Sequence, residues 1–401
     1  SHLDDGYYLV KDKDDSLNDV DDSKTRYIVQ VLDNKTDITP KSSKPEVIKK
    51  VKENTKDVTA TGQTFAGKDN YDVGTSYNDV ADYCIGDAVP FKLYGTMPDT
   101  IDDYSKYKYV FHDTLSKQFD APAEGNVSVK IDGTDAVGAT VSVDSTTNEI
   151  TVTFNDIKAE NKITKSSIVT VEYNAVLNSS AVIGLNGQEN KVYLTYSNNP
   201  HTNGTGTTVD HPAYDYTYGI DVTKVGSDED ETGNPKTLEG VQFTLQEKGS
   251  NEFIKADGTT TTDTNAAILT TNDKGMINVV GLDEGTYTLT EVTPAPGYNN
   301  SASKGVTFTI ARGTLQQDGT AVTPDKDSAN VTAADGVVKA GSATVSTGKL
   351  SFTIVDKKGS NLPLTGLNGV TFTWIAGGAV LCIGVAHLIR SRKQAEESEQ
   401  E

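Results

Sequence analysis

Three alternating strand motifs each carry one ionisable side chain in register with apolar ones: "YGIDVTKV", "GTYTLTEV" and "KLSFTIVD". The ionisable residues are Lys224, Glu291 and Asp356. Because side chains alternate between the two faces of a strand, each group shares a face with apolar neighbours. If that face is the core, burial favours the neutral amine and the neutral carboxylic acids. A neutral amine is a nucleophile, and a protonated acid can polarise a carbonyl and transfer a proton. An ordinary buried salt bridge is the alternative.

A second set has the same form nearer the N-terminus, in "KPEVIKKVKEN", "VFHDTLS" and "ENKVYLTYS". Alternation places Lys49, Asp113 and Asn190 with apolar residues on their own strands. Lys50 would be the inward lysine if Ile48 faced the core instead. The alternative is that Asp113 caps a turn and that Asn190 begins a strand.

An apolar segment lies near the end of the chain. Residues 369–389 are 21 residues without a formal charge, long enough to cross about 30 Å of hydrocarbon as a helix. Arg390, Arg392 and Lys393 follow and are typical of a cytoplasmic end. We therefore expect a membrane-spanning helix with a basic tail at 390–393; a buried core helix is the alternative.

The pentapeptide before this span resembles the LPxTG sorting signal of Gram-positive surface proteins. Its residues are Leu362, Pro363, Leu364, Thr365 and Gly366. In that family a sortase cysteine attacks the threonine carbonyl, and the acyl-enzyme then passes to an amine. The resemblance implies that the span holds the chain in the membrane only transiently. It also implies sortase as a partner, and a cell-surface protein covalently anchored to peptidoglycan through its threonine.

The rest of the chain consists of short alternating runs separated by Gly, Asn, Asp and Ser. This pattern predicts an all-β fold of tandem immunoglobulin-like β-sandwiches. The polar stretch "SNNPHTNGTGTTVDHPAYDY" predicts a linker, with a boundary near Tyr214. The predicted division is 1–44, the end of an N-terminal domain with a linker; 45–213, a first sandwich; 214–358, a second sandwich; and 359–401, the sorting signal.

The second block resembles the CnaB-like domains of Gram-positive pilins and adhesins. The matching pieces are "L-x-G-V-x-F-x-L", "G-T-Y-x-L-x-E" and "A-P-G-Y", together with the first-strand lysine. In that family the lysine forms an amide with an Asn or Asp of the last strand, catalysed by a buried Glu. The resemblance implies Lys224 as nucleophile, Glu291 as catalytic acid and Asp356 as acceptor, with Asn361 as the alternative acceptor. Most members have Asn, so Asp356 must be protonated and release water.

The first block resembles the fimbrial isopeptide-forming, CnaA-like domain of pilus backbone subunits. The matching pieces are "P-x-V-x-K-x-V", "I-G-D-x-V-x-F", "F-x-D-T-L-S" and "N-x-V-x-L-x-Y-S-N". The resemblance implies Lys49 as nucleophile, Asp113 as catalytic carboxylate and Asn190 as acceptor. Each crosslink is expected to join the first and last strands of its sandwich, and each acts once on its own chain.

Together these features resemble a SpaA-type major pilin, the shaft subunit of a sortase-assembled pilus, which is covalently joined to neighbouring pilin subunits. Such subunits are joined through a further lysine. Lys41 in "ITPKSSKPEV" is the candidate, with Lys35 and Lys44 as rivals. The alternative is a wall-anchored adhesin or ancillary pilin displayed singly, whose partner would be a host-surface ligand.

Composition excludes several other functions. The chain has 57 acidic and 36 basic residues, a net charge of −21, which argues against nucleic acid as a partner. None of its five histidines has the spacing of a metal site or a Ser–His pair, so we expect no metal, no cofactor and no turnover enzyme. Cys84 and Cys382 are not expected to pair, because Cys382 lies in the apolar span.

Overall fold

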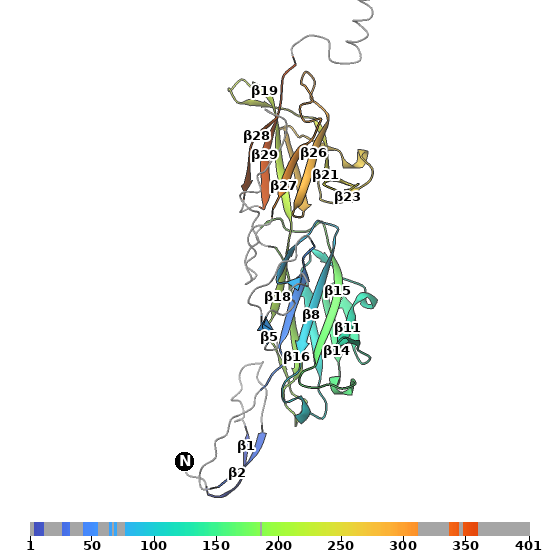
Figure 1. Ribbon diagram of the computed structural model, residues 1–401, viewed down its shortest axis with the longest axis vertical. Coiled ribbons are helices and arrows are strands. Elements are labelled where there is room, and N and C mark those ends of the chain that lie inside the picture. Colours follow the sequence, from blue (N-terminus) through green and yellow to red (C-terminus); the bar gives the residue numbers. More distant parts are fainter. Residues whose placement is uncertain are drawn as a thin grey trace, which may run out of the picture.

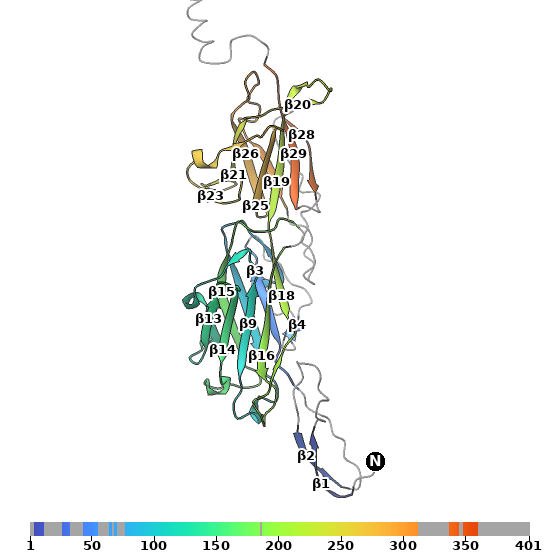
Figure 2. The ribbon, with the colours of Figure 1, turned by 180° about the vertical axis from the view of Figure 1, so that it is seen from behind.

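The computed structural model describes residues 4–11, 26–32, 43–54, 64–65, 68–69, 77–184, 187–311, 337–344 and 348–359. Two β-sandwiches lie end to end along the long axis, and a β-hairpin lies at the N-terminal end (Figures 1 and 2). Helical structure in these ranges is confined to single 3₁₀ turns: η1 Ile101–Asp103, η2 Glu124–Asn126, η3 Ile157–Ala159 and η4 Asn265–Ala267. The predicted all-β, tandem-sandwich fold class is confirmed.

The first sandwich consists of two seven-stranded sheets. One has the order β12-β11-β15-β8-β3-β6, with β10 also pairing with β15. Its strands are β12 Thr134–Asp135, β11 Ser128–Ile131, β15 Ile168–Leu177, β8 Ala88–Thr96, β3 Val47–Lys52, β6 Tyr77–Asn78 and β10 Phe119–Asp120. The facing sheet has the order β13-β14-β9-β16-β18-β7, with β17 also pairing with β16. Its strands are β13 Thr140–Asp144, β14 Glu149–Phe154, β9 Tyr109–Leu115, β16 Gln188–Ser197, β18 His211–Tyr216, β7 Val80–Asp82 and β17 Thr205–Thr207.

Period-two alternation explains these strands. In β15 every second side chain is buried from Val169 to Leu177, and the intervening ones are partly or fully exposed. The same alternation holds in β14. The buried faces of the two sheets enclose one apolar core, in which Phe91 and Phe111 are fully buried. Burial of these apolar faces is what stabilises the pairing.

The segment expected to be a linker is instead part of the first sandwich. Strand β18 pairs with β16 on one side and, in parallel, with β7 on the other. Ala213 and Asp215 of β18 are fully buried. The linker prediction was wrong here because the alternation is only two inward residues long and Pro212 interrupts the strand signal. Strand β16 is therefore not the last strand of this sandwich.

The second sandwich packs a five-stranded sheet on a six-stranded one. The first has the order β20-β19-β29-β28, with β25 pairing with β19. Its strands are β20 Pro235–Thr237, β19 Tyr218–Glu229, β29 Lys349–Asp356, β28 Val338–Thr344 and β25 Met276–Leu282. The second has the order β23-β22-β21-β26-β27, with β24 pairing with β21. Its strands are β23 Thr260–Thr261, β22 Phe253–Ile254, β21 Gln242–Glu247, β26 Gly285–Thr293, β27 Val306–Ile310 and β24 Leu269–Thr270.

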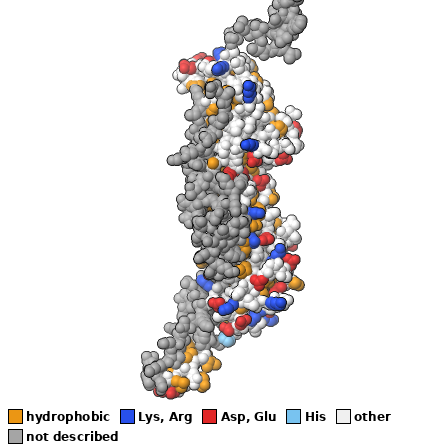
Figure 3. Space-filling model, in the orientation of Figure 1, with side chains coloured by type: hydrophobic (Ala, Val, Ile, Leu, Met, Phe, Trp, Pro, Cys, Tyr) orange, Lys and Arg blue, Asp and Glu red, His pale blue; other side chains and the backbone are white. Residues whose placement is uncertain are grey.

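The N-terminal hairpin pairs β1 Gly6–Lys11 with β2 Arg26–Val31. Leu9 and Ile28 face each other across it and are largely exposed, as is Tyr7. Hydrophobic side chains gather on the hairpin in Figure 3, whereas acidic and basic side chains are interspersed over the described parts of the sandwiches on the same face. A further two-stranded pair joins β4 Thr64–Phe65 to β5 Lys68–Asp69. In the part of the chain that the structure describes, no helix has the length and apolarity needed to cross a membrane.

Direct contacts join the two sandwiches. The Ile85 N–H donates to the Gly281 carbonyl at 3.0 Å, and Asn54 Nδ2 donates to Asp283 Oδ2 at 2.9 Å. Gly281 has φ +78°, and a Cβ at this position would lie 2.5 Å from the Ile85 side chain. Both the backbone conformation and the close approach therefore require glycine here.

Candidate functional site

The first sandwich brings four polar side chains into its apolar core. Lys49 comes from β3 and Tyr173 from β15, in one sheet, while Asp113 of β9 and Asn190 of β16 belong to the facing sheet. Lys49, Asp113 and Asn190 are all 0% exposed, and Tyr173 is 4% exposed. Alternation turns Asp113, Tyr173 and Asn190 inward, whereas both lysines of β3 are buried and Lys49 is the one that reaches Asp113 of the facing sheet.

Three of these groups form a closed ring of hydrogen bonds. Lys49 Nζ contacts Asp113 Oδ1 and also donates to the Tyr173 hydroxyl at 2.9 Å. The Tyr173 hydroxyl donates to Asp113 Oδ2 at 2.5 Å. The Phe91 ring lies over the amine, with its centroid 4.8 Å from Nζ. The amine is thus held by one carboxyl group, one phenol and an aromatic face.

Burial affects the protonation of both Lys49 and Tyr173. It lowers the pKa of Lys49, although the charge of Asp113 and its hydrogen bond act in the opposite direction. Burial, reinforced by the negative charge of Asp113, holds the pKa of Tyr173 well above its usual range, so the phenol stays protonated. Burial thus shifts Lys49 toward its neutral form, beside a phenol that stays neutral.

Asn190 lies in the same core without a hydrogen bond to Lys49. Its Oδ1 accepts a hydrogen bond from the Ser116 backbone N–H at 2.9 Å, and its Nδ2 has no hydrogen-bond partner among the described residues. Asn190 pairs with Leu115, and Val192 pairs with Asp113, so Asn190 is the diagonal neighbour of Asp113. The Ser116 N–H polarises the amide carbonyl, and the amide nitrogen is left without a competing bond.

Lys50, the rival lysine, has different surroundings. Its Nζ lies 2.6 Å from Asp79 Oδ1. Asp79 is partly exposed and lies outside the apolar core. Lys49, not Lys50, is the lysine beside Asp113.

The second sandwich contains a cluster of the same kind. Lys224 Nζ lies 3.0 Å from Glu291 Oε2 and 2.5 Å from Asp356 Oδ1. All three side chains are fully buried. Strands β19 and β29 are parallel neighbours, whereas β26 belongs to the opposite sheet. The nucleophile and acceptor candidates therefore share a sheet, and the acid candidate faces them from the other one.

Glu291 is poised to exchange a proton near neutral pH. Burial raises its pKa to about 7; Lys224 opposes this shift and Asp356 adds to it. The Ser301 backbone N–H donates to Asp356 Oδ1 at 3.1 Å, so this acceptor oxygen is also polarised by a main-chain donor. Asp356 Oδ2 and Glu291 Oε1 have no hydrogen-bond partner among the described residues.

Several predicted residues lie outside the described ranges. They are Lys35, Lys41, Asn361, the pentapeptide 362–366, the span 369–389 and the basic tail 390–393. The remaining linkage candidate, Lys44, is exposed and precedes β3. Sequence reasoning did not single out Tyr173, although its place in "IVTVEYNAVL" on the inward face of β15 was a usable signal.

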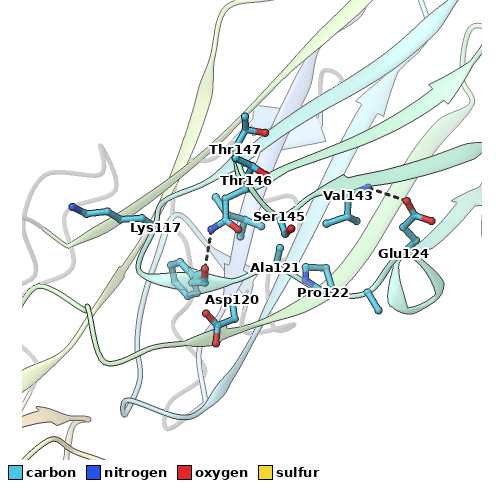
Figure 4. A pocket seen from close by; sticks show the side chains of 13 residues that line it. Lys117, Asp120, Ala121, Pro122, Glu124, Val143, Ser145, Thr146 and Thr147 are labelled. Atoms are coloured by element: carbon cyan, nitrogen blue, oxygen red, sulfur yellow. Dashed lines mark hydrogen bonds between the residues drawn. The ribbon is translucent and has the colours of Figure 1, made fainter.

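The described surface of the first sandwich also carries an open hollow. The hollow in Figure 4 encloses about 630 Å³ and is lined by Lys117, Asp120, Glu124 and residues of the 143–148 turn. In it the Val143 N–H donates to Glu124, and the other labelled groups converge on no common point. Within the described ranges, no group of three or more His, Cys, Asp or Glu residues could hold a metal ion.

Comparison with known proteins agrees with this architecture. A family model described as the SpaA prealbumin-like fold domain matches residues 219–323, which contain Lys224 and Glu291. Solved structures extend the likeness over most of the chain. The full-length major pilin RrgB of Streptococcus pneumoniae is 14% identical with a TM-score of 0.53, over 84% of this chain and 79% of that one. The fold is that of the major pilins.

Two further major pilins show the same fold. The backbone pilin of Streptococcus pyogenes is 19% identical with a TM-score of 0.51, over 80% of this chain and 71% of that one. The major pilin SpaD of Corynebacterium diphtheriae is 18% identical with a TM-score of 0.50, over 89% and 80% of the two chains. No curated protein matches this sequence significantly. In this fold, each sandwich buries a cluster of one lysine with one or two carboxyl groups.

Proposed function

We propose that this chain is a shaft subunit of a sortase-assembled cell-surface pilus, stiffened by two intramolecular amide bonds. Lys49 is joined to Asn190, and Lys224 is joined to Asp356. The observation that carries the proposal is the burial of a lysine against a carboxyl group in each of two successive sandwiches. A buried ion pair is weak evidence for a stabilising role, because desolvation offsets its attraction. Two such sets beside polarised acceptors favour bond formation.

The chemistry differs between the two sites. In the first, Lys49 Nζ attacks Asn190 Cγ, the C–N bond to Nδ2 breaks and ammonia leaves. In the second, Lys224 Nζ attacks Asp356 Cγ, a C–O bond breaks and water leaves. The second reaction needs a protonated Asp356, and the proton exchange of Glu291 near pH 7 supports this requirement. Asp113 and Glu291 are the acids that transfer protons in the two sites.

Polymerisation is assigned to the C-terminal signal. Sortase cleaves between Thr365 and Gly366 and transfers Thr365 to Lys41 of a neighbouring subunit or to peptidoglycan. The chain is thus a substrate of sortase and a structural protein. Its crosslinking groups react once and do not turn over.

Intact mass of the folded protein tests the two internal bonds. We expect the wild type to be lighter than its sequence by one ammonia and one water. Lys49→Ala should restore the ammonia and Lys224→Ala the water. Lys50→Ala is the matched control for Lys49→Ala and should keep both losses. A wild-type mass equal to that of the unmodified chain would exclude both bonds, and loss of the ammonia difference in Lys50→Ala alone would move the nucleophile to Lys50.

Cells that express the full protein with its sortase test the shaft role. Wild-type cells should show high-molecular-weight ladders in denaturing gels, and Lys41→Ala should abolish them. If Lys35→Ala or Lys44→Ala abolishes them instead, the linkage lysine is reassigned. A wall-attached monomer without ladders in wild-type cells would contradict the shaft role and favour the singly displayed adhesin.

A further inference from the structure

We propose that Tyr173 is a catalytic residue of the first crosslink: it carries a proton from the attacking lysine to the second oxygen of Asp113. This inference rests on the proposed Lys49–Asn190 bond. Its basis is that the Tyr173 hydroxyl bonds both the nucleophile and the acid of the site. It accepts from Lys49 Nζ at 2.9 Å and donates to Asp113 Oδ2 at 2.5 Å.

The two carboxyl oxygens of Asp113 have different roles in this ring of hydrogen bonds. Its Oδ1 contacts Lys49 Nζ directly, whereas its Oδ2 is reached from the amine through the phenol. A carboxyl group can take up a proton on one oxygen and release one from the other. The phenol makes this possible here, because it connects the amine to the oxygen that the amine does not contact.

The proton count closes without another reactant. The Lys49 ammonium first gives one proton to Asp113 Oδ1, which leaves a neutral amine and a neutral acid. Nζ then attacks Asn190 Cγ. As the adduct collapses, Nζ passes a second proton to the Tyr173 oxygen while the phenolic proton of Tyr173 moves to Asp113 Oδ2. The Oδ1 proton goes to Nδ2 of Asn190, and the C–N bond breaks to release ammonia. Asp113 ends protonated on Oδ2, and Tyr173 is regenerated.

The surroundings support this role for the phenol. Its pKa is held well above the usual value, first by burial and then by Asp113, so Tyr173 stays neutral and passes a proton without ionising. The carbonyl that must accept negative charge already bonds the Ser116 N–H at 2.9 Å. The protein thus supplies both a main-chain donor for the developing oxyanion and a path for the proton.

In the second sandwich, the proposed proton transfers do not need a phenol. Lys224 Nζ contacts Glu291 and Asp356 directly. Here the leaving group is water, and acceptor and acid are both carboxyl groups. Loss of the Tyr173 hydroxyl should therefore leave the second crosslink unchanged, which provides an internal reference in every molecule.

The test is a time course of crosslinking during refolding. The wild type and Tyr173→Phe are purified unfolded and uncrosslinked, diluted into refolding buffer and quenched in acid. Intact mass and peptide mapping then follow each bond, and circular dichroism follows folding. Tyr109→Phe is the matched control, because Tyr109 is a buried phenol of the same sandwich whose hydroxyl donates to the Thr96 carbonyl at 2.9 Å.

We expect Tyr173→Phe to fold at the wild-type rate, to form the Lys224–Asp356 bond normally and to form the Lys49–Asn190 bond at least ~10-fold more slowly, as for loss of a proton-transfer group. Its rate should also rise with pH, because the second proton must then leave to solvent, whereas the wild-type rate should be flat between about pH 6 and 8. A merely structural role would not produce this pH profile.

The outcomes separate this inference from the proposed function. If the wild type forms the Lys49–Asn190 bond and Tyr173→Phe forms it at the same rate with the same pH profile, Tyr173 is not a relay and the crosslink stands. Equal slowing in Tyr109→Phe would also overturn the relay. If the wild type never loses ammonia, the crosslink itself is wrong and the relay falls with it.

Discussion

Buried ionisable side chains are the basis of the proposed crosslinking chemistry. Lys49, Asp113, Lys224, Glu291 and Asp356 all lie in apolar cores. Taking a charge out of water is costly, and the cost falls when amine and acid neutralise each other by proton transfer. Conversion of the buried Lys224–Asp356 pair into an amide would remove both charges, and formation of the Lys49–Asn190 amide would leave Asp113 as a neutral acid. At the residue scale, the proposed crosslinks would thus remove the cost of burying these charges.

Asp215 is a buried acid outside both clusters. It is fully buried, and burial together with the negative charges of Asp82, Glu53 and Asp87 raises its pKa well above the usual value. The folded state then binds a proton that the unfolded state has lost. Stability should therefore fall as pH rises from about 4 to the pKa of the folded state, by about 1.4 kcal/mol per pH unit within that window.

We expect Asp215→Asn to raise the melting temperature at pH 8 and to have little effect near pH 4, because the amide resembles the protonated acid. Calorimetry at several pH values checks this. Asp135→Asn, at an exposed position, is the control and should leave the pH dependence unchanged. A destabilised Asp215→Asn at pH 8 would mean that the Asp215 carboxylate has a stabilising partner.

At the scale of elements, the two proposed bonds join different things. Lys49 and Asn190 come from opposite sheets, so their bond would tie one sheet of the sandwich to the other. Lys224 and Asp356 come from the parallel neighbours β19 and β29, so their bond would reinforce one strand pair. The first bond would resist separation of the two sheets, and the second would resist sliding of β19 against β29.

Each bond closes a loop of roughly 140 or 130 residues, which on the chain-entropy treatment of crosslinks stabilises the fold by about 5 kcal/mol. Asp113→Asn keeps the shape of the first site and should abolish its bond. We expect the first sandwich alone to unfold at lower temperature, with the second transition unchanged. Glu291→Gln is the reciprocal variant and should affect the second sandwich alone. Calorimetry combined with intact mass checks both, and equal transitions with the bond absent would contradict the expected stabilisation.

At the scale of the whole molecule, the two sandwiches pack closely against each other where Gly281 contacts Ile85. Gly281 has a positive φ and lies against Ile85, and its carbonyl accepts the Ile85 N–H. In the proposed shaft, force would pass between successive sandwiches, and we expect this contact to limit bending between them. The polar pair Asn54–Asp283 adds a second link at the same junction.

Gly281→Ala should loosen the junction, because the added Cβ would meet Ile85 at 2.5 Å in a strained backbone conformation. We expect a wider distribution of shapes in small-angle scattering and faster proteolysis near Ile85. Gly249→Ala is the matched control: its φ is also positive, at +92°, but no atom lies within 4 Å of its added Cβ. Equal effects of the two variants would assign the change to backbone strain alone.

The all-β class and the inward-facing positions of Lys224, Glu291 and Asp356 follow from the sequence alone, whereas the sequence left Lys49 and Lys50 as alternatives. The physical reason is that period-two alternation is local: a strand shows its inner face in its own residues. The roles of these residues stay predictions, which intact mass and calorimetry test.

Contacts between distant parts of the chain depend on the tertiary structure, because no local sequence pattern contains them. Tyr173 lies 124 residues from Lys49 along the chain, and the two side chains meet because β8 pairs with both β15 and β3 in one sheet. The Ser116 N–H on Asn190 depends on where β9 ends beside β16. Strand β18 forms because its neighbours supply the hydrogen bonds, although its own sequence resembles a linker. In each case the deciding interactions are long-range, and packing of the whole core selects them.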